Sequence, residues 1–167
     1  MNKGSAGAGK RGRPTKTIKR PATRALVGTA GRITKLVEDV TDRKVLSEAD
    51  IARLVERRIP MRAILKLKAI GFSDGEIDAF VLPARTRRHR IELAQPLTVE
   101  ESDRAVRLLR LQAQAEKAFN NPDKARRWLR KPLTVLNGQT PLDFARTDAG
   151  ARTVETILAK IAWGAAA

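Results

Sequence analysis

Residues Ala125–Pro132 read ARRWLRKP, and they are followed by LNGQTPLD at Leu136–Asp143 and by TDAG at Thr147–Gly150. These three stretches contain two prolines, two glycines and Thr or Asp at positions typical of helix starts, so they restrict the backbone closely. An apolar run at helical spacing follows and ends in Trp163-Gly164. The pattern predicts short helices joined by tight turns, in which most of the quoted residues act as caps, stops and core wedges.

The signals upstream of these stretches are helical as well. Capping boxes precede apolar runs at Ser47–Asp50, Ser73–Glu76 and Thr98–Glu101. The third box opens a long helix to about Phe119, whose apolar residues form two stripes, which indicates burial on more than one side, for example in a dimer. Asn121-Pro122 restarts the chain as N-cap and first helical residue. Because no run alternates as a strand does, the predicted fold class is all-α.

A helix-turn-helix layout is predicted between residues 63 and 93: a helix, Gly71, a short capped helix, the turn Leu82-Pro83 and a basic helix. On the basic helix, Ala84 and Ile91 share one face, which we expect to dock on the preceding helix. The basic side chains would then be free to reach DNA, where Arg can bond a guanine bidentately. The alternative is a solvated basic face that enters no groove.

The expected DNA contacts of this unit share a place at the start of the short helix or on the basic helix. They are Ser73, Arg85, Thr86, Arg87, Arg88, His89 and Arg90. We expect Arg85, His89 and Arg90 to project outward, with Thr86 near the N-terminal end of the basic helix.

The charge of the chain also indicates a polyanionic partner. The 167 residues carry a formal net charge of +16 at pH 7, which favours nucleic acid first and a membrane surface second. No apolar stretch is long enough to span a bilayer, and the basic N-terminus lacks the apolar core of a secretory signal. We therefore expect a cytoplasmic protein without a membrane partner.

Catalytic and metal-binding chemistry finds little support in the composition. The chain has no Cys, which excludes a disulfide framework and a thiolate zinc site, and its one His cannot build a metal site or a catalytic triad alone. Carboxylates are scattered over capping and helix-surface positions, and Ser47, Ser73 and Ser102 fit the same roles. We expect no enzyme, no metal and no cofactor.

The first 24 residues are predicted to form a disordered basic arm, since they contain eight Lys or Arg residues and no acid. Gly4–Lys10 imitates a phosphate loop, but Arg11 stands where Ser or Thr is needed and no strand precedes it. Arg11 and Arg13 lie in an Arg-Gly-Arg-Pro sequence similar to the core of an AT-hook, which enters the A·T minor groove. The alternative is a generic arm that only neutralises phosphates, and both alternatives predict DNA.

Residues 50–164 resemble the Xre/MbcA/ParS family of antitoxins. In the C-terminal part the resemblance rests on Trp128-Leu129, Pro132, Gly138, Thr140-Pro141-Leu142, Gly150 and Gly164. In the helix-turn-helix part it rests on Arg58-Ile59-Pro60, Gly71-Phe72-Ser73, Arg85-Thr86 and Arg88. The sequence departs from the family where Asn137 stands at a frequent Gly, where Phe144 replaces a smaller aliphatic residue, and where Arg58-Ile59-Pro60 lacks the common Gly before Pro.

The resemblance implies a type II antitoxin. Its partner would be a RES-domain toxin that consumes NAD⁺, and its C-terminal domain and tail would cover the toxin's active site. It would also bind the shared promoter as a homodimer and repress it. The toxin-binding residues that the resemblance suggests are Trp128, Arg130, Gly150, Trp163, Gly164, Ala165, Ala166 and Ala167.

The expected organisation is therefore the arm at 1–24, an Xre-like helix-turn-helix DNA-binding domain at 25–95 and a small helical toxin-binding domain at 96–167. An alternative function from another class is a stand-alone basic DNA-binding architectural protein or transcription regulator.

Overall fold

The structure, a computed structural model, describes residues 22–164, with side chains described from residue 31. Its elements are α1 (Ala22–Thr41), α2 (Glu48–Glu56), α3 (Ala63–Ala69), α4 (Asp74–Phe80), α5 (Ala84–Glu92), α6 (Val99–Phe119), α7 (Pro122–Leu129), the 3-10 turn η1 (Thr134–Leu136), α8 (Pro141–Phe144) and α9 (Asp148–Ala162). The prediction of an all-α fold is confirmed over this range. Of the predicted arm, only the last three residues are described, and they open α1.

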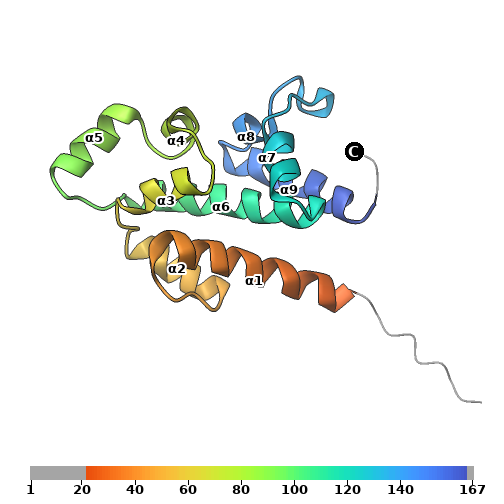
Figure 1. Ribbon diagram of the computed structural model, residues 1–167, viewed down its shortest axis with the longest axis horizontal. Coiled ribbons are helices and arrows are strands. Elements are labelled where there is room, and N and C mark those ends of the chain that lie inside the picture. The colour runs from red at the N-terminus through yellow and green to blue at the C-terminus, as the bar shows by residue number, and fades with distance from the viewer. Residues whose placement is uncertain (1–21, 165–167) are drawn as a thin grey trace, which may run out of the picture.

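Helix α6 is the central element of the fold (Figure 1). It packs against α1 and α2 on one side and against α7 and α9 on the other. Both of its predicted apolar stripes are buried within this chain; their buried members are Val106, Leu108, Leu109, Leu111, Ala113 and Ala115. The second stripe thus packs against helices of the same chain, which explains the double pattern without a dimer.

Local capping signals set the helix boundaries as predicted, but the predicted box at Ser47 is incomplete, because Asp50 accepts from the N–H of Leu46 and not from that of Ser47. Ser73 and Thr98 both form complete capping boxes, with Glu76 and Glu101 as the reciprocal partners. Asn121 caps α7, with Pro122 as its first residue. These interactions satisfy backbone N–H groups that a helix leaves unpaired at its start.

The loop before α3 is fastened to the start of α6. The backbone N–H of Ile59 donates to Ser102 Oγ at 2.9 Å, and Arg58 Nε donates to the carbonyl of Leu97 at 2.9 Å. Arg58 has a φ of 63°, in the left-handed region that favours glycine. The Arg58 side chain thus secures a loop whose backbone is left-handed at the same residue.

The turn before α8 also uses left-handed backbone. Asn137 and Gly138 have φ values of 55° and 77°. Asn is the residue other than Gly that tolerates this region best, which explains why it can stand at the departure from the family pattern. Thr140 then caps α8, and Thr147 caps α9.

Candidate nucleic-acid interface and partner surface

Helices α4 and α5 form the helix-turn-helix, joined by Val81, Leu82 and Pro83. Val81 and Leu82 are each 1% exposed, so the turn itself is anchored in the core. The expectation that Ala84 and Ile91 dock on α4 is wrong. Both are exposed, Ile91 by 58%, and α5 contains no buried residue. The helix is therefore held at its base by the turn and elsewhere by charged contacts.

Two arginines of α5 supply those contacts. Arg87 forms ion pairs with Asp74 and Asp78 on α4, the latter at 3.0 Å. Arg90 Nε lies 3.1 Å from a carboxylate oxygen of Glu101, whose side chain is only 7% exposed. The expectation that Arg90 projects outward is therefore wrong, because the buried Glu101 at the start of α6 needs a cation.

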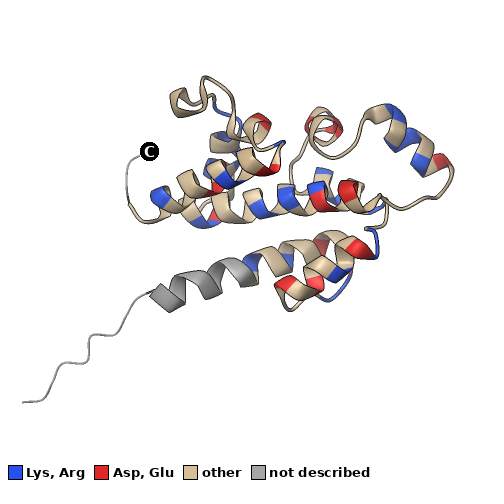
Figure 2. Cartoon of the chain, turned by 180° about the vertical axis from the view of Figure 1, so that it is seen from behind, with Lys and Arg blue, Asp and Glu red and all other residues tan. Residues whose placement is uncertain are grey.

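Three basic residues of α5 lie on its accessible face, with the exposed Glu92 at its C-terminal end. Arg85, Arg88 and His89 are exposed at spacings of three and four residues, so they share one side of the helix, while Thr86 is half-buried. Figure 2 shows α5 as a mainly basic helix at the end of the molecule opposite to the last turns of α9. Such a helix offers Arg side chains to base edges and phosphates. Arg11 and Arg13 lie outside the described residues.

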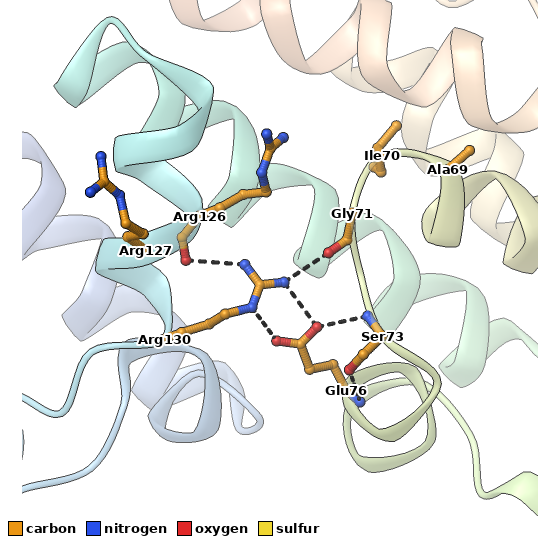
Figure 3. A pocket seen from close by; sticks show the side chains of 8 residues that line it. All are labelled: Ala69, Ile70, Gly71, Ser73, Glu76, Arg126, Arg127 and Arg130. Atoms are coloured by element: carbon orange, nitrogen blue, oxygen red, sulfur yellow. Dashed lines mark hydrogen bonds and ion pairs between the residues drawn. The ribbon is translucent and has the colours of Figure 1, made fainter.

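Ser73 caps α4 and places Glu76 beside the C-terminal half of the chain. Arg130, which follows α7, donates from Nε to one carboxylate oxygen of Glu76 at 2.6 Å and from Nη2 to the other at 2.9 Å (Figure 3). Its remaining donors reach the carbonyls of Gly71 and Arg126. Burial alone raises the pKa of Glu76, but the hydrogen bonds from Arg130 and Ser73 and the charge of Arg130 bring it below its ordinary value.

Arg130 was expected to contact a toxin, but the structure commits its guanidinium to this intramolecular contact. The sequence carried no signal for this pair, since the partners are 54 residues apart. The sequence also carries no signal for the pair of Arg90 and Glu101. Arg90 is predicted to contact DNA, and Glu101 is predicted to complete a capping box.

The other expected partner-binding residues fall into two groups. Trp128 is half-buried, with its ring 5.7 Å from that of Phe119, and Gly150 is buried. A Cβ on Gly150 would lie 1.8 Å from the carbonyl oxygen of Phe144, so this glycine allows α8 and α9 to meet. Trp163 is different, because it is 72% exposed at the end of α9.

The end of the chain continues from that exposed tryptophan. Gly164 has a φ of 79°, which turns the backbone out of the helix. Ala165, Ala166 and Ala167 lie outside the described residues. Among the helices that are described, none is both long and apolar enough to cross a membrane.

Comparison with known proteins gives two family matches. The antitoxin Xre-like helix-turn-helix domain matches residues 50–110, and the antitoxin Xre/MbcA/ParS C-terminal toxin-binding domain matches residues 114–164. Together they run from α2 to the end of α9, across both surfaces described above.

Individual relatives are similar over part of their length. Antitoxin Xre of Pseudomonas putida is 45% identical over 84 residues, which are 50% of this chain and 53% of the relative. The Prs ADP-ribosylating antitoxin of a Sphingobium species is 34% identical over 97 residues, 53% of this chain and 61% of the relative. Antitoxin Xre of Photorhabdus laumondii is 34% identical over 68 residues, 40% and 46% of the two chains. The chain spans about half the length of the curated relatives it matches.

Proposed function

The chain belongs to the Xre/MbcA/ParS family of antitoxins of type II toxin-antitoxin systems, and on that premise we propose that it neutralises a RES-domain toxin that consumes NAD⁺. The toxin would supply the NAD⁺ chemistry, and this chain would act as a cover without catalysis of its own. The name of the Sphingobium relative refers to ADP-ribosylation, a reaction that uses NAD⁺ as donor, which supports a partner of this class.

The observation that carries the proposal is the exposure of Trp163. A tryptophan that is 72% exposed is costly to leave in water and is common at the centre of protein interfaces. In the proposed mechanism, Trp163 anchors the end of α9 on the toxin, and Gly164 to Ala167 enter the active-site cleft. The small, uncharged side chains of this tail suit a narrow cleft.

Trp128, Arg130 and Gly150 receive a different role in this mechanism. They support the surface from inside, since they pack or bond within the chain. The proposed division of the chain stays at 1–24, 25–95 and 96–167.

The second half of the proposal is autorepression in the cytoplasm. A homodimer would place two copies of α5 about one DNA turn apart, with Arg85, Arg88 and His89 toward the bases. Arg11 and Arg13 in the arm would add contacts in the minor groove or to phosphates.

A binding comparison tests this half directly. The full chain is titrated with a fluorescent duplex from its own promoter and with a random duplex of equal length, over a range of salt concentrations. The proposal expects a preference for the promoter by about 10³-fold or more. Equal affinity for both duplexes would instead favour the alternative, a stand-alone architectural DNA-binding protein.

A further inference from the structure

A basic pocket lies where the two halves of the chain meet. It has a volume of about 530 Å³ and is lined by the corner between α3 and α4 and by one side of α7 (Figure 3). The corner contributes Gly71 and Ser73, and α7 contributes Arg126 and Arg127. Neither the helix-turn-helix motif nor the toxin-facing tail accounts for this pocket.

The pocket keeps a positive charge after its internal ion pair is counted. Four ionisable residues line it, three arginines and Glu76. Arg130 donates to both carboxylate oxygens of Glu76, so the charges of these two residues cancel. Arg126 pairs with Asp123, whose side chain is 71% exposed, and such an exposed pair is weak. For Arg127, no carboxylate lies within ion-pair distance among the described residues.

The orientation of these arginines favours an external anion. In Figure 3 the side chains of Arg126 and Arg127 both point away from the Arg130–Glu76 pair, but Arg126 points toward the Gly71 side and Arg127 toward the other side of α7. Neither guanidinium is bonded to the other labelled residues. A Cβ at Gly71 would lie 3.1 Å from Arg126 Cδ. The glycine thus lets Arg126 pass close to the α3–α4 corner.

The position of the pocket identifies the anion. In a helix-turn-helix, the second helix enters the major groove and the first helix crosses the sugar-phosphate backbone. Here α4 is the first helix, and its first turn forms ion pairs with both α5 and the residue that follows α7. Asp74 pairs with Arg87 of α5, and Glu76 pairs with Arg130 beyond α7. The pocket and the reading helix are therefore attached to the same turn of α4.

We propose that Arg126 and Arg127 bind backbone phosphates of the duplex that α5 reads, one phosphate for each guanidinium group. The proposal rests on the DNA binding proposed above and adds a contact from α7, which belongs to the C-terminal domain. Guanidinium groups suit a phosphodiester because they bond two of its oxygens at once. The contact would position the duplex without distinguishing sequences.

The test uses the full chain with Arg126 and Arg127 both changed to Ala. Binding is measured by fluorescence anisotropy on the promoter duplex and on the random duplex, from about 50 to 200 mM salt. We expect roughly tenfold weaker binding to both duplexes and a salt slope smaller by about one to two, since each phosphate contact contributes about 0.9 to the slope.

Arg43→Ala is the matched control. Arg43 is an exposed arginine in the α1–α2 connection, across α6 from α7, so its loss tests a general effect of net charge. Far-UV circular dichroism and thermal midpoints should match the wild type in both variants. A salt slope of the double variant equal to that of Arg43→Ala would overturn the proposal.

Two further outcomes are distinguishable. If the double variant keeps its salt slope but no longer neutralises the toxin, the pocket contacts the toxin and the phosphate proposal is wrong. If the wild type shows no preference for the promoter, the proposal of autorepression is wrong. The change of slope on random DNA still decides whether the pocket binds phosphate.

Discussion

Arg130 holds Glu76 with two parallel hydrogen bonds, Nε to Oε1 at 2.6 Å and Nη2 to Oε2 at 2.9 Å. The pair joins the end of α7 to the first turn of α4, and therefore the C-terminal half of the chain to the helix-turn-helix. Bidentate pairs of this kind hold two elements in one relative orientation.

Removal of the clamp should destabilise the chain. We expect Arg130→Ala to lower the free energy of unfolding by about 2 kcal/mol, because it leaves the half-buried carboxylate of Glu76 without its strongest donor. Urea unfolding measures the change. Arg127→Ala, an exposed arginine of the same segment, should stay within about 0.5 kcal/mol of the wild type. Equal effects of the two substitutions would show that the clamp contributes no stability.

The clamp should also depend on pH. Because the pKa of Glu76 is lowered in the folded chain, its charge favours folding above the ordinary value of 4.5. This contribution should disappear as the pH falls through the lowered folded-state pKa. Glu76→Gln keeps a capping residue but removes the charge. The difference in unfolding free energy between wild type and Glu76→Gln should be constant near neutral pH. It should shrink toward zero as the pH falls into the acid range. A difference independent of pH would contradict the assignment.

Two arginines on α5, two residues apart, should behave differently when changed to Ala. Arg90→Ala leaves Glu101 buried without a cation, so we expect a loss of about 3 kcal/mol of stability. Arg88→Ala removes an exposed side chain, so stability should change by less than about 0.5 kcal/mol. If Arg88 contacts a base, its substitution should weaken promoter preference by about 1–3 kcal/mol. Thermal unfolding and anisotropy on the same samples separate the two roles; the reverse pattern would refute them.

Gly150 and Gly75 allow a matched pair of substitutions. A methyl group at Gly150 collides with the backbone of Phe144, whereas nothing lies within 4 Å of one at Gly75 in α4. We expect Gly150→Ala to cost about 1–3 kcal/mol as overpacking. Gly75→Ala should add about 0.5–1 kcal/mol through helix propensity. Denaturant midpoints give both values, and an unchanged midpoint for Gly150→Ala would return this residue to the candidate toxin contacts.

The sequence predicted what depends on neighbours along the chain. Ser73, Thr98 and Asn121 each satisfy backbone groups within three residues, so their capping roles are readable without a fold. Gly71 also ends α3 as expected, with a φ of 106°. Such local rules account for the confirmed helix pattern.

The partners of charged side chains were beyond local rules. The sequence predicts Glu101 as the capping-box partner of Thr98. Its ion pair with Arg90 depends on the fold, because only the packed structure buries the Glu101 carboxylate. Helical spacing predicts a buried Ile91, but α5 buries none of its residues. The family resemblance suggests a toxin contact for Arg130, and no local pattern points to its intramolecular partner Glu76, which is 54 residues away in sequence.

We propose that one chain carries two separable surfaces, and α5 and the end of α9 lie near opposite ends of the molecule (Figure 1). Deletion of the five residues from Trp163 to Ala167 tests it most directly. The RES-domain reading frame expected beside the gene is co-expressed with wild type or deletion variant, and growth and promoter affinity are both measured. Leu46→Ala, a 74% exposed apolar residue between α1 and α2, is the control. The account predicts growth arrest by freed toxin with promoter affinity within about twofold of wild type, a difference below 0.5 kcal/mol. Loss of both activities, or of neither, would contradict it.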